Sequence, residues 1–154
     1  MGAEEQLAAL GIELPDPPTP VASYVPVVVS GGLAFVAGQV PLAEGKLLAT
    51  GKLGADLDAE AGADAARTCA LQALAALRAE LGSLDRIHRI VKLTVFVASA
   101  PGFTDQPKVA NGASDLLGEV FGEMGRHARA AVGVSELPLG ASVEVEVIAE
   151  VADL

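Results

Sequence analysis

The sequence predicts an α+β fold in which two long helices pack on one face of a mixed sheet. Residues 58–81 repeat apolar side chains every three or four positions, as helices do, and a second such pattern follows between Thr104 and Gly125. Residues 86–99 and 142–151 instead alternate apolar and polar side chains, as strands do. Helices interspersed with strands and hairpins are typical of an α+β sheet rather than of a helical bundle.

The chain of 154 residues is long enough for one domain with a core of its own. We expect residues 1–21 to be an N-terminal extension and residues 22–154 to be that single domain. Within the extension, residues 4–12 can form a short helix. Four prolines in the stretch LPDPPTP then favour an extended connector over 13–20. The N-terminus has neither a basic region nor a long apolar run, so no signal peptide is expected.

A hairpin opens the predicted domain. Strand-like residues 24–29 and 33–40 flank a Gly-Gly pair, which is a common hairpin turn. Gly38 lies inside the second strand and indicates a bulge or a close approach of the backbone to another group. A short third strand is expected near 46–50.

The first long helix has clear boundary signals. Asp56 or Asp58 can cap its start, and Gly82 suits the position just after its end. Its apolar residues form one stripe, which is expected to face the sheet.

The rest of the chain contributes a long strand, the second helix and two closing strands. The second helix is expected to have Thr104 as its N-cap and to end at Gly125. The closing strands cover 128–134 and 142–151, which brings the expected number of strands in the sheet to six. In the last strand the valines share one face and the glutamates the other.

The amino-acid composition narrows the classes of function that can be expected. The formal charge is −10, from 20 acidic and 10 basic residues, and aromatic residues make up only 3%. Such a chain lacks the basic surface and the stacking platform of most nucleic-acid-binding proteins, so we expect a small molecule or another protein as partner. No apolar run is long enough to span a membrane. The single cysteine, Cys69, rules out an internal disulfide and agrees with a reducing, cytoplasmic location.

Arg129 stands out among the polar residues because small apolar residues follow it along its strand. If it faces a cleft, its guanidinium can hold a carboxylate with two hydrogen bonds. The alternative is an ordinary surface arginine beside a strand. Glu144 and Glu146 share one face of the last strand, where they are either solvated charges or, if another subunit covers that face, candidates to pair with Arg129 or to hold a water.

The remaining candidates favour structural roles. His88 and His127 are isolated, and no spacing typical of metal ligands connects them, so no metal site is expected. His127 could shuttle a proton, but a surface or interface role is favoured. Arg126 and His127 end the second helix, where cations suit the helix C-terminus, and at that position they need no further function. Cys69 is expected to be a small core residue. No nucleotide-binding or hydrolase motif is present, and no cofactor is expected.

Three stretches together resemble the reactive-intermediate deaminase family, RidA/YjgF, also called the endoribonuclease L-PSP family. YVPVVVSGGLAFVAGQVP is similar to the family's opening hairpin. VKLTVFVASAPGF is similar to its central strand and the turn that follows. HARAAVGVSELPLGASVEVEVIAEV is similar to its closing signature. The resemblance covers roughly residues 22–151 and identifies the chain as a divergent member.

The resemblance implies a chorismate-mutase-like α+β fold, with a mixed six-stranded sheet and two helices on one face. It further implies a homotrimer with ligand clefts between subunits. The implied activity is the hydrolysis of small 2-imino or enamine acids, such as 2-aminoacrylate, to 2-keto acids and ammonia. Hydrolysis of an already electrophilic imine requires positioning and a route for protons more than a strong nucleophile.

Five residues carry site roles by resemblance. Arg129 corresponds to the arginine that holds the substrate carboxylate, and Glu144 to the acid that polarises or orients the attacking water. Tyr24 corresponds to a tyrosine lining the cleft, and Gly38 to a glycine whose backbone approaches the ligand. Asn111 lies about one position from the family's asparagine on the second helix.

The chain also departs from the family pattern. Ala37 replaces a serine, and Ala131 replaces a cysteine that is frequent at that position. These losses leave open a non-catalytic trimeric protein that binds small carboxylic or keto acids. A ribonuclease is the least favoured function, because of the charge and the low aromatic content.

Overall fold

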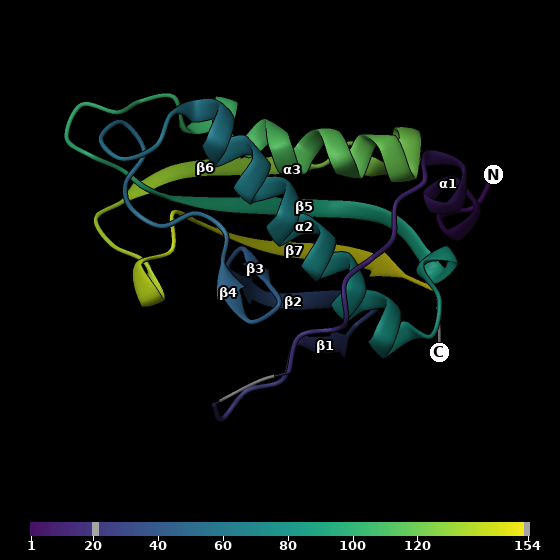
Figure 1. Ribbon diagram of the computed structural model, residues 1–154. Coiled ribbons are helices and arrows are strands. Elements are labelled where there is room, and N and C mark those ends of the chain that lie inside the picture. Colours follow the sequence, from purple (N-terminus) through teal and green to yellow (C-terminus); the bar gives the residue numbers. More distant parts are fainter. Residues whose placement is uncertain (20–21, 153–154) are drawn as a thin grey trace.

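The computed structural model describes residues 1–19 and 22–152, and a mixed sheet with two long helices on one face forms its centre (Figure 1). Five strands make this sheet in the spatial order β1-β2-β7-β5-β6. They are β1 (Val27–Ser30), β2 (Leu33–Gln39), β7 (Val143–Val151), β5 (Ile87–Ala98) and β6 (Ala128–Val134). The helices on its face are α2 (Ala59–Leu81) and α3 (Gln106–Phe121), and a short helix α1 (Ala3–Leu10) lies beside one end of α3. Neighbouring strands are antiparallel except β5 and β6, which are parallel.

The predicted α+β class with two helices on one face is confirmed, but the sheet has five strands instead of six. The segment expected to add a strand near 46–50 forms a small separate hairpin from β3 (Leu42–Ala43) and β4 (Lys46–Leu47). Glu44 and Gly45 between them both have positive φ. Two such residues make a tight two-residue turn, which folds the segment back on itself rather than onto the sheet.

The two central strands, β7 and β5, bury the faces that were expected, except at one position in β5. In β7 the valines and Ala149 are buried, while the glutamates are partly or fully exposed. In β5, Leu93, Val95 and Val97 are buried as predicted. Val91 was expected on the same face but is only partly buried. The pairing register between β5 and β7 shifts between Ile90 and Lys92. Because of this irregularity, Ile90 occupies the core instead of Val91.

The start and end of α2 agree with the prediction. The Asp58 carboxylate accepts a hydrogen bond from the Ala61 N–H at 2.9 Å, and Gly82 has a φ of 85° just after the helix. Small buried residues, mainly alanines, line its inner face.

Both predicted boundaries of the second helix are wrong. Asp105, not Thr104, occupies the N-cap position of α3, and it makes no side-chain capping bond. The helix ends at Phe121 because Gly122 turns to a φ of 58°, and a short 3-10 turn then runs to Gly125.

Helix α1 and the domain share one core. Ala3 and Leu7 are buried together with residues of α2, α3 and the sheet. The Glu4 carboxylate accepts the Leu84 N–H at 2.9 Å and contacts the Arg78 guanidinium at 3.3 Å. The first helix of the extension therefore contributes to the core. No helix among residues 1–19 and 22–152 has the length and apolar character needed to cross a membrane.

Candidate functional site

Arg129 lies on the edge strand β6 and points toward the helix-covered side of the sheet. It pairs with Leu93 across the parallel β5–β6 ladder, and Leu93 is fully buried under the helices. Its Nη1 donates to Asn111 Oδ1 at 2.8 Å and to Ser114 Oγ at 3.1 Å. Asn111 and Ser114 are three residues apart on α3, so one face of that helix holds the guanidinium.

A second pair of side chains extends this contact. Ser114 Oγ lies 2.9 Å from His127 Nε2, and His127 Nδ1 lies 2.7 Å from the Gly125 carbonyl oxygen. Sequence analysis missed Ser114, and for His127 it favoured a surface or interface role over a proton shuttle. Two spacings in the sequence could have indicated these residues. Ser114 lies three positions after Asn111 and so shares its helix face, and His127 lies two positions before Arg129.

The hydrogen bonds leave one side of the Arg129 guanidinium for a ligand. Nη1 carries two hydrogens, and Asn111 and Ser114 accept from that atom. Within the part of the chain that the structure describes, Nη2 and Nε donate to no protein group. A guanidinium can bind a carboxylate through two parallel N–H bonds. The side chain is exposed, so a carboxylate can reach the Nε and Nη2 side from solvent.

Glu144 and Gly38 meet on the opposite face of the sheet. The β2–β7 register shifts between Val36 and Gln39, so Gly38 lies at a bulge, as its position in the strand predicted. The Glu144 carboxylate packs directly against Gly38, where any Cβ atom would collide with it. Partial burial raises the pKa of the Glu144 carboxyl, and the nearby charge of Glu146 raises it further.

Within one chain, Arg129 and Glu144 are not brought together. Glu144 pairs with Phe96 and Arg129 with Leu93, and residues three apart on β5 point to opposite faces. Tyr24 is exposed and precedes β1, which begins at Val27 rather than at residue 24 as expected. Of the five predicted site residues, the structure pairs Arg129 with Asn111 and Glu144 with Gly38, and it leaves Tyr24 apart.

The surroundings of the other candidate residues do not indicate a functional site. Cys69 is fully buried, as predicted, and burial raises the pKa of its thiol far above the usual range. His88 is exposed at the start of β5. Among residues 1–19 and 22–152, no three histidine, cysteine or acidic side chains gather in a way that could hold a metal ion.

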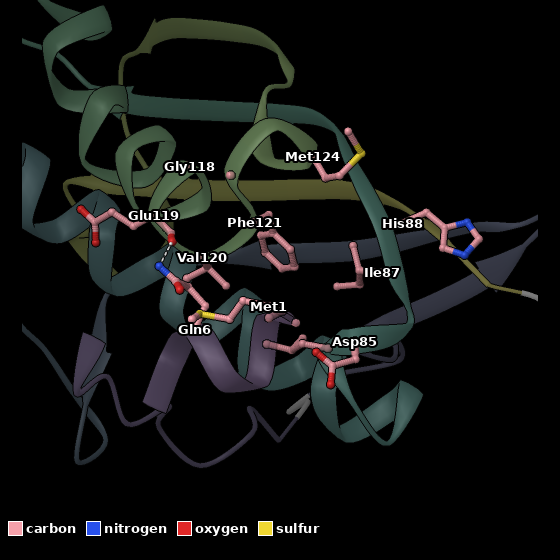
Figure 2. Close-up of a pocket in the computed structure, with 14 residues that line it drawn as sticks. Met1, Gln6, Asp85, Ile87, His88, Gly118, Glu119, Val120, Phe121 and Met124 are labelled. Atoms are coloured by element: carbon pink, nitrogen blue, oxygen red, sulfur yellow. Dashed lines mark hydrogen bonds between the residues drawn. The ribbon is translucent and has the colours of Figure 1, made fainter. Parts of the chain in front are cut away.

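A pocket of about 470 Å³ lies away from Arg129, between α1, the C-terminal end of α3 and the start of β5. Figure 2 shows Phe121 and Ile87 on its apolar side, and Gln6 donating to the Glu119 carbonyl oxygen at 3.1 Å. None of the five predicted site residues lines it. Its residues come mainly from α1 and the elements that α1 covers.

Comparison with known families gives a match over nearly the whole chain. Residues 4–151 match the family model described as "YjgF/chorismate_mutase-like, putative endoribonuclease". The chain belongs to this YjgF-like family. The resemblance noted from the three sequence stretches is therefore confirmed, and the match extends N-terminal of residue 22 to include α1.

Several relatives and solved structures are similar to this chain over most of its length. Protein TCP17 of Trypanosoma cruzi is 53% identical over 145 residues, covering 94% of this chain and 91% of that protein. The structure of Atu1372 from Agrobacterium tumefaciens, a protein of unknown function, has a TM-score of 0.89 and 47% identity, covering 98% and 94% of the two chains. A putative endoribonuclease from Shewanella oneidensis has a TM-score of 0.94 and 37% identity, covering 98% and 100%.

Proposed function

We propose that this protein hydrolyses small reactive 2-imino and enamine acids, such as 2-aminoacrylate, to 2-keto acids and ammonia. The observation that carries the proposal is the position of Arg129. Asn111 and Ser114 hold its Nη1, while Nε and Nη2 remain available on an exposed side chain. A fixed guanidinium with one open side suits the carboxylate that all these substrates share.

The chemistry needs little more than positioning and proton transfer. The C=N carbon of an imine is electrophilic, so water can add once the substrate is held in place. Glu144 is the acid proposed to orient that water. Its raised pKa brings a carboxyl closer to the range in which it can exchange protons near neutral pH. The reaction as proposed requires no cofactor.

The complete site is proposed to form between subunits of a homotrimer. Arg129 and Glu144 lie on opposite faces of one chain's sheet, so they can share a ligand only if a second copy supplies one of them. The face that α2 and α3 leave uncovered carries exposed Val28, Phe35 and Val132, which is apolar surface suited to burial against another copy.

The direct test is a coupled assay. A pyridoxal-phosphate dehydratase generates 2-aminoacrylate, and release of the keto acid is followed with and without this protein. We expect acceleration by the wild type. Arg129→Ala should lower kcat/KM by at least roughly 30-fold, which corresponds to a loss of about 2 kcal/mol of transition-state stabilisation, because a charge-assisted contact is lost.

Arg126→Ala is the matched control, since Arg126 is an exposed neighbour whose guanidinium lies 3.6 Å from the exposed Glu123 carboxylate. It should leave the rate unchanged. No acceleration by the wild type, or equal rates for Arg129→Ala and the wild type, would contradict the proposal. Calorimetry that showed Arg129-dependent binding of 2-ketobutyrate without turnover would instead support a non-catalytic binding protein.

The ribonuclease named in the family description is not favoured for this chain. A formal charge of −10 opposes binding of a polyphosphate backbone. RNA cleavage that survived repurification and disappeared in Arg129→Ala would overturn this view.

A further inference from the structure

Behind Arg129, a chain of hydrogen bonds connects its guanidinium to the backbone of the segment before β6. Arg129 Nη1 lies 3.1 Å from Ser114 Oγ, and Ser114 Oγ lies 2.9 Å from His127 Nε2. His127 Nδ1 in turn lies 2.7 Å from the Gly125 carbonyl oxygen. Ser114 and His127 are both half-buried, whereas Arg129 is exposed. The chain of bonds therefore ties an exposed side chain to groups that are partly removed from solvent.

The far end of this chain is anchored from two sides. Gly125 is buried, and a Cβ atom there would collide with the Leu117 carbonyl oxygen of α3. From β5, Arg89 Nη2 donates to the Arg126 carbonyl oxygen at 3.0 Å. A helix and a strand thus hold the two residues before His127, and the imidazole ring is attached to a fixed backbone.

Donor and acceptor chemistry gives the chain its direction. A carbonyl oxygen only accepts, so His127 Nδ1 donates to Gly125. A guanidinium only donates, so Ser114 Oγ accepts from Arg129 Nη1. The hydroxyl has one hydrogen and two lone pairs, so it can donate to His127 Nε2 or accept from it and still accept from Arg129. The contact with the guanidinium is the same in both cases and requires no change in the charge of His127.

These contacts fix the Arg129 side chain at both ends. Its Cα belongs to β6, and its Nη1 uses both hydrogens on two acceptors of α3, Asn111 Oδ1 at 2.8 Å and Ser114 Oγ. An exposed arginine that is not held in this way loses much rotamer freedom when it binds a ligand, and this loss weakens binding. Here the ordering is already present, and the Nε and Nη2 hydrogens are left side by side, as a planar carboxylate requires.

We propose that His127 is a positioning residue for Arg129, which acts through Ser114 Oγ to present the Nε and Nη2 edge of the guanidinium in one orientation. This rests on the proposed deaminase function and adds to it the groups that set the affinity of the site for a carboxylate. The role requires no contact between the ligand and either Ser114 or His127. It belongs to binding, and the chemical step is unaffected.

The first measurement follows the guanidinium itself and needs no substrate. In protein labelled with ¹⁵N-arginine, the two Nη1 hydrogens of a held guanidinium give separate NMR signals, and their exchange rate reports how firmly it is held. The Arg129 signals are those missing from Arg129→Ala. His127→Ala and Ser114→Ala should each raise this exchange rate about 3- to 10-fold, the usual effect of one lost hydrogen bond.

Two controls accompany this measurement. Ser114→Thr keeps the hydroxyl and should keep the slow exchange. His88→Ala removes the other histidine, which is exposed at the start of β5, and should leave the Arg129 signals as they are in the wild type.

The second measurement is ligand binding. Calorimetry with 2-ketobutyrate should give a Kd about 3- to 10-fold higher for His127→Ala than for the wild type. In the coupled assay KM should rise by a similar factor while kcat changes little, because the carboxylate is held alike in the ground and transition states. A general loss of structure would instead lower kcat, or the fraction of active protein.

A double-mutant cycle tests whether His127 acts through Ser114. In the Ser114→Ala background, His127→Ala should cause no further rise in the Kd or in the exchange rate. A second loss of the same size as the first would overturn the proposal, since His127 would then act by another route. If His127→Ala fails to fold, His127→Phe, which fills the same space without either ring nitrogen, replaces it in every comparison.

The outcomes separate this proposal from the proposed function. An active wild type whose His127→Ala variant keeps the wild-type exchange rate and Kd would overturn the positioning role alone. A wild type that neither binds 2-keto acids nor accelerates deamination would overturn the proposed function, and the role of His127 toward a ligand with it.

Discussion

Gly38 and Glu144 show how one residue without a side chain sets the chemistry of another. The bulge in β2 brings the Gly38 backbone against the Glu144 carboxylate, and a Cβ atom at this position would force the Glu144 side chain to shift. The carboxylate is partly removed from water at this contact. Loss of hydration disfavours the charged form, and for this reason the pKa of Glu144 is raised.

This raised pKa makes a prediction about stability. Because the folded pKa lies above that of the unfolded chain, the fold favours the protonated carboxyl, and stability falls as the pH rises between the two values. Glu144→Gln removes the penalty. Relative to the wild type, the variant should therefore be more stable at about pH 8 than at about pH 4 in urea unfolding at one fixed protein concentration.

Glu150→Gln is the matched control for this comparison. Glu150 is exposed on the same face of β7, so its replacement should give no comparable pH-dependent gain. A stability difference between Glu144→Gln and the wild type that is the same at both pH values would contradict the assigned cause.

At the scale of elements, the contact between α2 and α3 controls where the Arg129 partners lie. Gly112 of α3 packs so closely on Ala63 of α2 that a Cβ atom would collide with the Ala63 carbonyl oxygen. Asn111 is next to Gly112 in the helix, and Ser114 lies about half a turn beyond Gly112. A change in this helix spacing therefore moves both groups that hold the guanidinium.

We expect Gly112→Ala to cost about 1–3 kcal/mol in the free energy of unfolding, the usual effect of overpacking, and to lower the proposed deaminase activity as well. Gly118→Ala is the control in the same helix, because a Cβ atom at Gly118 meets nothing within 4 Å. It should instead stabilise the protein by about 0.5–1 kcal/mol through helix propensity. Chemical denaturation measures both. Equal effects of the two substitutions would show that the helix contact is not as tight as the structure has it.

The elements also show which parts of the fold were predictable. The bounds 128–134 were predicted correctly, and β7 to within one residue, because both segments carry clear β-rich patterns. The end of α3 was placed too late. Gly118, Gly122 and Gly125 all offer a stop, and only the backbone angle at Gly122 decides between them.

The candidate site was predictable only in part. The resemblance pointed to Arg129 and to Asn111, although with an uncertain register for Asn111, and the structure brings the two side chains to 2.8 Å. The contact between Ser114 and His127 could not be predicted in this way, since the two residues are 13 positions apart. They meet only because α3 packs alongside the lead-in to β6, and no local pattern of residues encodes that packing.

At the scale of the whole molecule, the sheet separates the candidate site residues of each chain into two groups, which are the half-sites of the proposed trimer. Arg129 with Asn111 and Ser114 lies on the helix side of the β6 edge, and Glu144 with Gly38 lies on the uncovered face. A symmetric ring of copies repeats the same contact between each neighbouring pair. Every contact in the proposed trimer would then join one half-site of each kind.

This arrangement predicts complementation between two inactive variants. Arg129→Ala and Glu144→Gln each remove one half-site, so each variant alone should have little activity. If a complete site takes Arg129 from one chain and Glu144 from the next, trimers assembled from an equal mixture should have about a quarter of their sites intact. The measurement is the coupled deaminase assay on co-expressed, differently tagged variants, with the two proteins purified apart and mixed without exchange as the control. Absence of any recovered activity in mixed trimers would contradict a site shared between chains, and a Glu144→Gln variant that is active by itself would show that Glu144 plays no part in the reaction.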